Sequence, residues 1–301
     1  MTAVKKVLVA VDFSSCSRDA LREGARIAAL EGASLSAVHV VRVPVMTPMP
    51  EFGFMPEVQI EGALERAHET WRRVAQETGL DPSVRCSFEV GRPQQGILDA
   101  VSTQRPNLLI VGAHGSTDAW RHIGFVAVSC IQHCASPVLV VRQGHAGPFR
   151  KVLACVDLSE TARRALDEAI RVAVRDGAAL DVLHLFADPW DGRKPPAAMQ
   201  KNVPDFRERY RAAVEERVRE FLAPVAVELQ ALKAQLRVEM APDHGFAIVT
   251  DVRERGFDLV TIGTRSKWNA RDFFLGSTAE RVVRGSPCSV LAVKPPGFEQ
   301  P

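Results

Sequence analysis

The sequence repeats itself with a period of about 145 residues. Residues 6–14 read KVLVAVDFS and residues 151–159 read KVLACVDLS. Near the end of each half the match returns at an offset of about 152, where residues 138–141 read VLVV and residues 290–293 read VLAV. Solenoid repeats have periods of roughly 20–50 residues, whereas 145 residues is about the size of a domain. We therefore predict two related domains, over residues 1–144 and 150–301.

The junction between the halves and the bulk composition fit a globular protein. Residues 143–150 read QGHAGPFR, with the Gly and Pro content of a short linker. Hydrophobic residues make up 46% of the chain and charged residues 25%, which is ordinary for a globular protein. The formal net charge is +2, so we expect no nucleic-acid partner.

Features of membrane and secreted proteins are missing from the sequence. There is no apolar run near 18 residues and no signal-peptide pattern. The six cysteines are scattered without a CxxC pair, as in proteins of a reducing compartment. We therefore expect a cytoplasmic protein without membrane contact.

Short apolar runs alternate with longer segments of helical periodicity in both halves. The predicted strands are 7–11, 35–41, 84–90, 108–111, 138–141, 152–156, 179–186, 236–240, 259–262 and 290–293. The predicted helices are 16–30, 57–79, 96–104, 161–175, 205–222, 246–255 and 279–284. This alternation implies parallel sheets with right-handed crossovers. The predicted fold class is α/β, with two tandem doubly wound domains, each a five-stranded parallel sheet flanked by helices.

Two Pro-rich segments interrupt the alternation. Residues 44–56 and 188–204 each follow the second strand of their half, at the edge where doubly wound domains bind ligands. Each segment fits an ordinary crossover linker or a flap over a ligand.

A glycine-containing loop in the second half suggests an anion site. Gly263 follows a strand, and Gly276-Ser277-Thr278 precedes a helix. Glycine lets a backbone approach a ligand closely, and the amides of residues 276–278 would point outward from the helix N-terminus toward an anion. Ser and Thr are also common N-caps, so the fragment alone fits capping equally well.

The whole arrangement resembles the universal stress protein (UspA) family. Nucleotide-binding members carry Gly-x2-Gly-x9-Gly-Ser/Thr after the fourth strand, and the likeness covers essentially the full chain as two family domains. It implies the adenine nucleotide alpha hydrolase-like fold, with ATP or a related adenine nucleotide as ligand, with or without Mg²⁺. The site residues that it implies in the second domain are Cys155, Val156, Asp157, Leu185, Gly263, Ser266, Gly276, Ser277 and Thr278. Those in the first domain are Ala10, Val11, Asp12, Val40, Gly112, Gly115 and Gly124.

The two halves differ at the loop that the resemblance assigns to the phosphates. The second half keeps the nine-residue spacing and the hydroxyl pair, with Ser266 in place of the second glycine. The first half has eight residues between Gly115 and Gly124, and Phe125-Val126 replaces the hydroxyl pair. We therefore expect the second domain to be the stronger nucleotide site.

One cluster of possible metal ligands can also be explained as buried side chains of the core. Cys130, His133 and Cys134 share a predicted helix near His122 and could hold zinc, but the second half has Val282, Gly285 and Ser286 there, which favours buried small side chains.

Two pairs of residues recur at equivalent positions of the halves. His39 and His184 end apolar strands and could act as general bases or as packed, hydrogen-bonded side chains, which we favour. Asp12 and Asp157 fit ligand contact or loop anchoring better than metal binding. No catalytic signature is present, so no catalytic residue is predicted.

The resemblance implies a stress-response regulator or scaffold that binds nucleotide and acts through conformation and partner choice, with unidentified protein partners. The alternatives are slow ATP hydrolysis at the second domain and a nucleotide-free dimerising scaffold. Family domains commonly associate through the last strand. Residues 138–141 and 290–293 are then expected to pair, within one chain as a pseudo-dimer or between chains as a homodimer.

Overall fold

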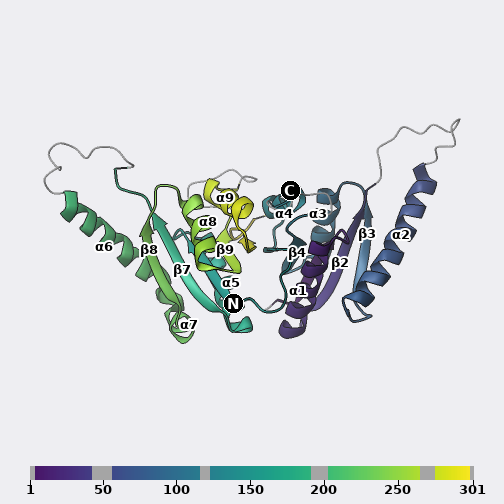
Figure 1. Cartoon of the computed structure of the whole chain (residues 1–301), viewed down its shortest axis with the longest axis horizontal. Coiled ribbons are helices and arrows are strands. Elements are labelled where there is room, and N and C mark those ends of the chain that lie inside the picture. Colours follow the sequence, from purple (N-terminus) through teal and green to yellow (C-terminus); the bar gives the residue numbers. More distant parts are fainter. Residues whose placement is uncertain (1–3, 43–55, 116–122, 191–202, 265–274, 299–301) are drawn as a thin grey trace. The chain divides into compact units, whose positions relative to one another are not determined.

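The structure is a computed structural model that describes residues 4–42, 56–115, 123–190, 203–264 and 275–298. The chain divides into two compact units (Figure 1), residues 1–147 with 289–301, and residues 148–288. The division after residue 147 lies inside the linker read from the sequence. The final strand of the second repeat belongs to the first unit.

The first unit is built on a mostly parallel sheet in the order β3-β2-β1-β4-β5-β10. Its strands are β1 (Lys6–Val11), β2 (Ser34–Val41), β3 (Arg85–Val90), β4 (Leu108–Gly112), β5 (Val138–Val141) and β10 (Ser289–Val293). The first five are parallel, and β10 runs antiparallel to β5 with Leu291 opposite Leu139. The predicted pairing of residues 138–141 with 290–293 is confirmed.

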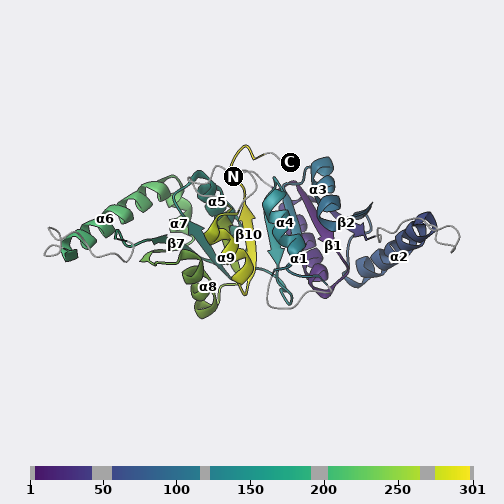
Figure 2. The same cartoon turned by 90° about the horizontal axis from the view of Figure 1, so that it is seen from above.

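Helices cover both faces of this sheet. They are α1 (Ser15–Glu31), α2 (Pro56–Glu77), α3 (Pro93–Gln104) and α4 (Phe125–His133). Figure 2 shows α1 and α3 on opposite sides of the sheet, as right-handed crossovers with a reversal of strand order require. Helix α1 begins where Ser14 Oγ accepts the Ser17 N–H and ends at Gly32 in the left-handed region, where glycine is favoured.

The second unit repeats this plan with the parallel order β9-β6-β7-β8. Its strands are β6 (Lys151–Val156), β7 (Ala179–Phe186), β8 (Gln235–Met240) and β9 (Leu259–Gly263). Its helices are α5 (Glu160–Asp176), α6 (Val203–Leu222), α7 (Ala226–Ala231), α8 (His244–Arg255) and α9 (Ser277–Gly285), with a 3-10 turn η3 (Ala223–Val225) between α6 and α7. Helix α5 is capped as α1 is, by Ser159 and Gly177.

The continuous apolar runs form the buried strands, as predicted. Val7, Leu8 and Val9 in β1 are at most 1% exposed, and Val152 and Leu153 in β6 are fully buried. The α/β fold class with two tandem repeats is therefore confirmed. Among the helices that the structure describes, none is long and apolar enough to cross a bilayer.

Candidate functional site

A tight turn after β1 holds Asp12 at the carboxyl edge of the sheet. Asp12 Oδ1 accepts hydrogen bonds from the Ser14 N–H (3.0 Å) and the Ser14 hydroxyl (2.6 Å). Phe13 lies between them at φ 64°, a left-handed conformation that is unfavourable for a non-glycine residue. Asp12 Oδ2 has no hydrogen-bond partner among the described residues. Asp12 therefore anchors the loop with one oxygen and leaves the other for a ligand.

The second repeat has the same turn after β6. Asp157 Oδ1 accepts from the Ser159 N–H (3.0 Å), and Leu158 adopts φ 61°. The preceding residues Cys155 and Val156 are buried, while Asp157 is exposed. Burial raises the pKa of the Cys155 thiol, which keeps it uncharged.

A cavity of about 780 Å³ opens at the carboxyl ends of β1, β2 and β4 in the first unit. All seven residues predicted for the first domain line it: Ala10, Val11, Asp12, Val40, Gly112, Gly115 and Gly124. They come from four separate segments of the chain. This is the edge at which doubly wound sheets bind ligands, near the reversal of strand order.

The wall of the cavity combines apolar side chains with a fixed histidine. Val40 and Ile97 are buried and line it. His39 lines it too, and its Nδ1 lies 2.8 Å from the Val11 carbonyl oxygen, to which only a protonated nitrogen can donate. Burial lowers the pKa of His39, so the ring is neutral at pH 7. The predicted structural role of this histidine is confirmed.

His184 repeats this geometry in the second unit. Its Nδ1 lies 2.8 Å from the Val156 carbonyl oxygen, and burial lowers its pKa. The repeated histidine therefore joins the ends of the first two strands in each repeat.

The glycine loop of the first repeat ends at the N-terminus of α4. The Gly124 N–H donates to the Ala113 carbonyl (2.6 Å), and no side chain caps the helix. Phe125 and Val126 line the cavity at this end, with Phe125 70% exposed. The first-turn amides of α4 are without intrahelical partners, as at every helix N-terminus, and can receive an anion.

The second repeat keeps this geometry and adds hydroxyls. The Gly276 N–H donates to the Thr264 carbonyl (3.1 Å), so the expectation that this amide is free for an anion is wrong. Ser277, which is exposed, and Thr278, which is half-buried, begin the uncapped helix α9. Thr264 is 1% exposed and its hydroxyl has no hydrogen-bond partner among the residues that the structure describes.

The remaining predicted site residues of the second domain are Leu185, Ser266 and Gly263. Leu185 is half-buried near the carboxyl end of β7, and Ser266 lies outside the described residues. Gly263 packs against α5, where a Cβ would lie 2.9 Å from Thr161 Cγ2, and its role in ligand approach stays a prediction.

The two cysteines at the C-terminal end of α4 are buried, and His133 beside them is half-buried. Cys130 and Cys134 are fully buried, and burial raises the pKa of the Cys134 thiol to about 11, so it is uncharged at pH 7. Zinc binds the thiolate form. His133 Nδ1 lies 2.9 Å from the Ser129 carbonyl oxygen, and His122 lies outside the described residues. Within the described part of the chain, no group of three or more His, Cys, Asp or Glu is placed to hold a metal.

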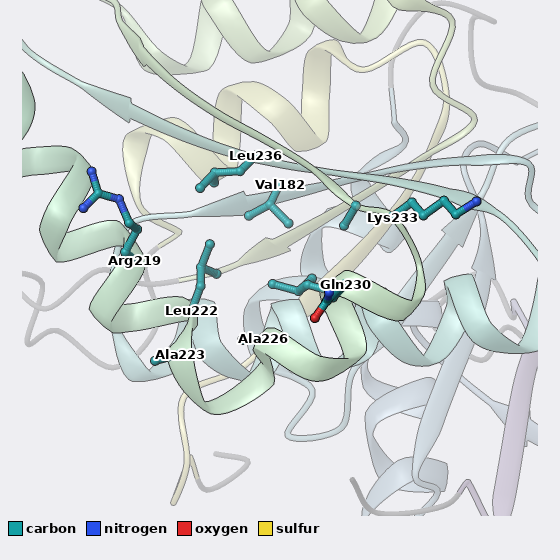
Figure 3. Close-up of a pocket in the computed structure, with 10 residues that line it drawn as sticks. Val182, Arg219, Leu222, Ala223, Ala226, Gln230, Lys233 and Leu236 are labelled. Atoms are coloured by element: carbon teal, nitrogen blue, oxygen red, sulfur yellow. The ribbon is translucent and has the colours of Figure 1, made fainter.

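A second cavity, of about 590 Å³, lies in the second unit between β7, β8 and the segment from α6 to α7. Figure 3 shows Val182, Leu222 and Leu236 around it, with the charged ends of Arg219 and Lys233 directed away on opposite sides. Its wall is mostly aliphatic and it borders the first half of the strands rather than their carboxyl ends. It is not part of the predicted site.

The residues of the first cavity that were not predicted from the sequence include four polar side chains, Arg42, Arg92, Gln94 and His114. Each follows a strand or begins a helix at the ligand edge. Their position after predicted strands is a signal that sequence reasoning could have used.

Comparison with known proteins shows the family of the chain. The sequence profile of the Universal stress protein family matches residues 3–142 and 148–294. A universal stress protein of Mycolicibacterium smegmatis is 26% identical over 298 residues, which cover 96% of this chain and 97% of the relative. The crystal structure of a universal stress protein from Archaeoglobus fulgidus superposes with a TM-score of 0.66 at 20% identity, covering 96% of this chain and 98% of that one. A putative universal stress protein from Pseudomonas aeruginosa gives a TM-score of 0.68 at 17% identity, with 97% and 94% coverage. Since the family profile matches both repeats, the chain belongs to the universal stress protein family.

Proposed function

We propose that this protein binds an adenine nucleotide, ATP or a close relative, in the cavity at the carboxyl ends of β1, β2 and β4. Occupancy of the cavity would then set conformation and partner choice in a stress response. One observation carries the proposal: seven residues chosen from four segments of the sequence line a single cavity of about 780 Å³. Pockets for small molecules and cofactors have volumes of roughly 300–1,000 Å³.

Groups that line the cavity can contact the base, the ribose and the phosphate of a nucleotide. Val40 and Ile97 provide apolar contact for a flat base. The free Oδ2 of Asp12 can accept a hydrogen bond from a ribose hydroxyl. The first-turn amides of α4, beginning at Phe125, can hold a phosphate. Backbone N–H groups would thus bind the phosphate in place of the hydroxyl pair that Phe125-Val126 replaces.

Asp12 is also the residue that would hold Mg²⁺ if the ligand brings one. It is the one carboxylate among the described residues that line the cavity. Protein-bound Mg²⁺ commonly uses one or two carboxylates together with phosphate oxygens, so a single aspartate fits this ion.

We propose a second nucleotide site at the equivalent edge of the second unit, formed by Asp157, Leu185, Ser277 and Thr278, and the expectation that it is the stronger of the two sites stays a prediction. Two observations support it. The Asp157 turn and the uncapped helix α9 repeat the geometry of the first unit. The buried Thr264 hydroxyl, which has no partner within the described ranges, is an additional donor at the start of the same loop.

Direct analysis of bound nucleotide tests the proposal. Purified protein is denatured and the supernatant is examined for ATP, ADP and AMP by chromatography. Protein freed of nucleotide is then melted with and without ATP. Ligand at one hundred times its Kd stabilises a protein by about 2.7 kcal/mol, so a clear rise of Tm is expected. The absence of both co-purified nucleotide and a Tm shift at millimolar ATP would contradict the proposal and favour the nucleotide-free scaffold.

A further inference from the structure

The end of the first cavity away from the glycine loop carries two arginines. Arg42 follows β2 and Arg92 follows β3, and both line the cavity. The Gly91 N–H donates to the Val41 carbonyl (3.0 Å), which holds the ends of the two strands side by side. Both arginines are exposed, and neither forms an ion pair among the described residues. Two positive charges therefore lie at one end of the cavity, with no counter-charge paired to them in the described part of the chain.

The N-terminus of α3 adds to this positive potential. Arg92 is its N-cap and makes no side-chain capping bond, Pro93 follows, and the first turn has no acidic residue. Helix N-termini carry a partial positive charge and unpaired N–H groups. The arginines and the helix thus act on the same end of the cavity.

The second repeat has the opposite charge at this position. Helices α3 and α8 both span twelve residues, and the N-cap equivalent to Arg92 is Asp243. Asp243 accepts from the Phe246 N–H (3.0 Å) and forms an ion pair with Arg281. Ala187 stands where the first repeat has Arg42. In the second repeat the Asp243 side chain therefore caps the helix N-terminus, whereas in the first repeat no described side chain caps the equivalent N-terminus.

Strand geometry sets the distance between the two ends. The sheet order β3-β2-β1-β4 places β4, which leads into the glycine loop, two strands from β2 and three from β3. Neighbouring strands lie about 4.8 Å apart, so the backbones at the two ends are separated by roughly 10–14 Å, and the long arginine side chains must extend across part of that distance to meet a second phosphate of the same ligand. When one phosphate binds at the α4 N-terminus, the two arginines remain available to bind a second anionic group of the same ligand.

We propose that Arg42 and Arg92 form a second anion subsite, and that the first cavity prefers a nucleotide with two separated phosphates. This inference rests on the proposed nucleotide site. The chemical class is a nucleoside bisphosphate, phosphorylated at two positions of the ribose. Guanidinium groups bind phosphate oxygens through paired, charge-assisted hydrogen bonds. A nucleotide with a single phosphate chain engages only one of the two ends.

Calorimetric titration with two isomeric ligands tests this subsite. Adenosine 3′,5′-bisphosphate and ADP both carry two phosphates, separated in one and joined in the other. The bisphosphate is expected to bind the unmodified protein about tenfold more tightly, a difference of about 1.4 kcal/mol. An Arg42→Gln, Arg92→Gln double variant should lose this preference while keeping its affinity for ADP within about a factor of three. Arg85→Gln, an exposed arginine at the start of β3, is the matched control and should keep the preference.

The outcomes separate the two proposals. Equal affinities in the unmodified protein, or a preference that survives the double variant, would overturn the subsite and leave the nucleotide site standing. Failure of both ligands to bind would overturn the nucleotide site and the subsite together. Equal Tm values for the double variant and the control establish that both are folded.

Discussion

Gly263 lacks a side chain where Thr161 occupies the space that a side chain would fill. A Cβ on Gly263 would lie 2.9 Å from Thr161 Cγ2 and 3.3 Å from the Ala162 nitrogen. Gly112 has the same relationship to Cys16 in the first repeat, at 3.1 Å. A Cβ on Gly276 would meet its nearest atom at 3.8 Å. The glycine that ends β4 or β9 therefore serves helix packing, whereas Gly276 is open toward the ligand edge.

Gly263→Ala is expected to lower the free energy of unfolding. Added volume at a tightly packed contact typically costs about 1–3 kcal/mol. Gly276→Ser is the control, because Gly276 has ordinary extended N-cap backbone angles and serine is a preferred N-cap. Urea unfolding of both variants measures the difference. Equal stability of the Gly263 variant and the unmodified protein would show that the contact with α5 relaxes freely.

Arg237 lies in a charged network that the first repeat replaces with neutral groups. Its guanidinium donates to both carboxylate oxygens of Asp251 and lies 3.4 Å from Asp181. These three side chains are 11%, 15% and 6% exposed. At the equivalent place in the first repeat, the Ser36 hydroxyl donates to Gln104 Oε1 (2.8 Å).

Arg237→Ala is expected to destabilise the protein by about 3–5 kcal/mol, since it removes the cation beside the buried Asp181 and leaves Asp251 with Arg255 as its remaining cation. Ser36→Ala removes a neutral hydrogen bond and should cost about 0.5–1.5 kcal/mol. Chemical denaturation of the pair compares the two networks directly. A smaller loss for Arg237→Ala than for Ser36→Ala would refute the assigned role of the ion pairs.

Stability is expected to fall as the pH drops below about 6.5. Burial lowers the pKa of His39 and His184 from the ordinary value of 6.5. Below that pH the unfolded chain binds more protons than the folded one, so the unfolding free energy decreases as the pH falls. Above pH 6.5 the two histidines cause no such decrease. A double variant, His39→Asn and His184→Asn, keeps an N–H donor but does not titrate. Its unfolding free energy should change less between pH 6.5 and 5, as followed by urea titrations. An unchanged slope would contradict this origin of the pH dependence.

Sequence patterns located the strands and most of the candidate site for a physical reason. Strands buried on both faces require continuous apolar runs, and each predicted strand agrees with the structure to within one residue at either end. Residues at the carboxyl ends of those strands, such as Asp12 and Val40, then meet at one edge because the strands are parallel.

Other features depend on contacts that no local pattern encodes. The turn η3 and helix α7 were missed because they are short and Pro224 interrupts the helical pattern. The apolar run 290–293 does not itself indicate a partner, and its pairing with β5 was expected from the family resemblance alone. Arg42 and Arg92 lie fifty residues apart, and only the register of β2 with β3 brings them together.

Photoaffinity labelling tests the central proposal most directly. The protein is irradiated with an azido-adenine analogue of ATP, digested, and its labelled peptides are identified by mass spectrometry. Label is expected on peptides that contain residues 38–42, 111–115 or 124–127, which line the first cavity, and excess ATP should abolish it. Label that resists competition by ATP, or that falls away from the carboxyl ends of the strands in both repeats, would contradict the account.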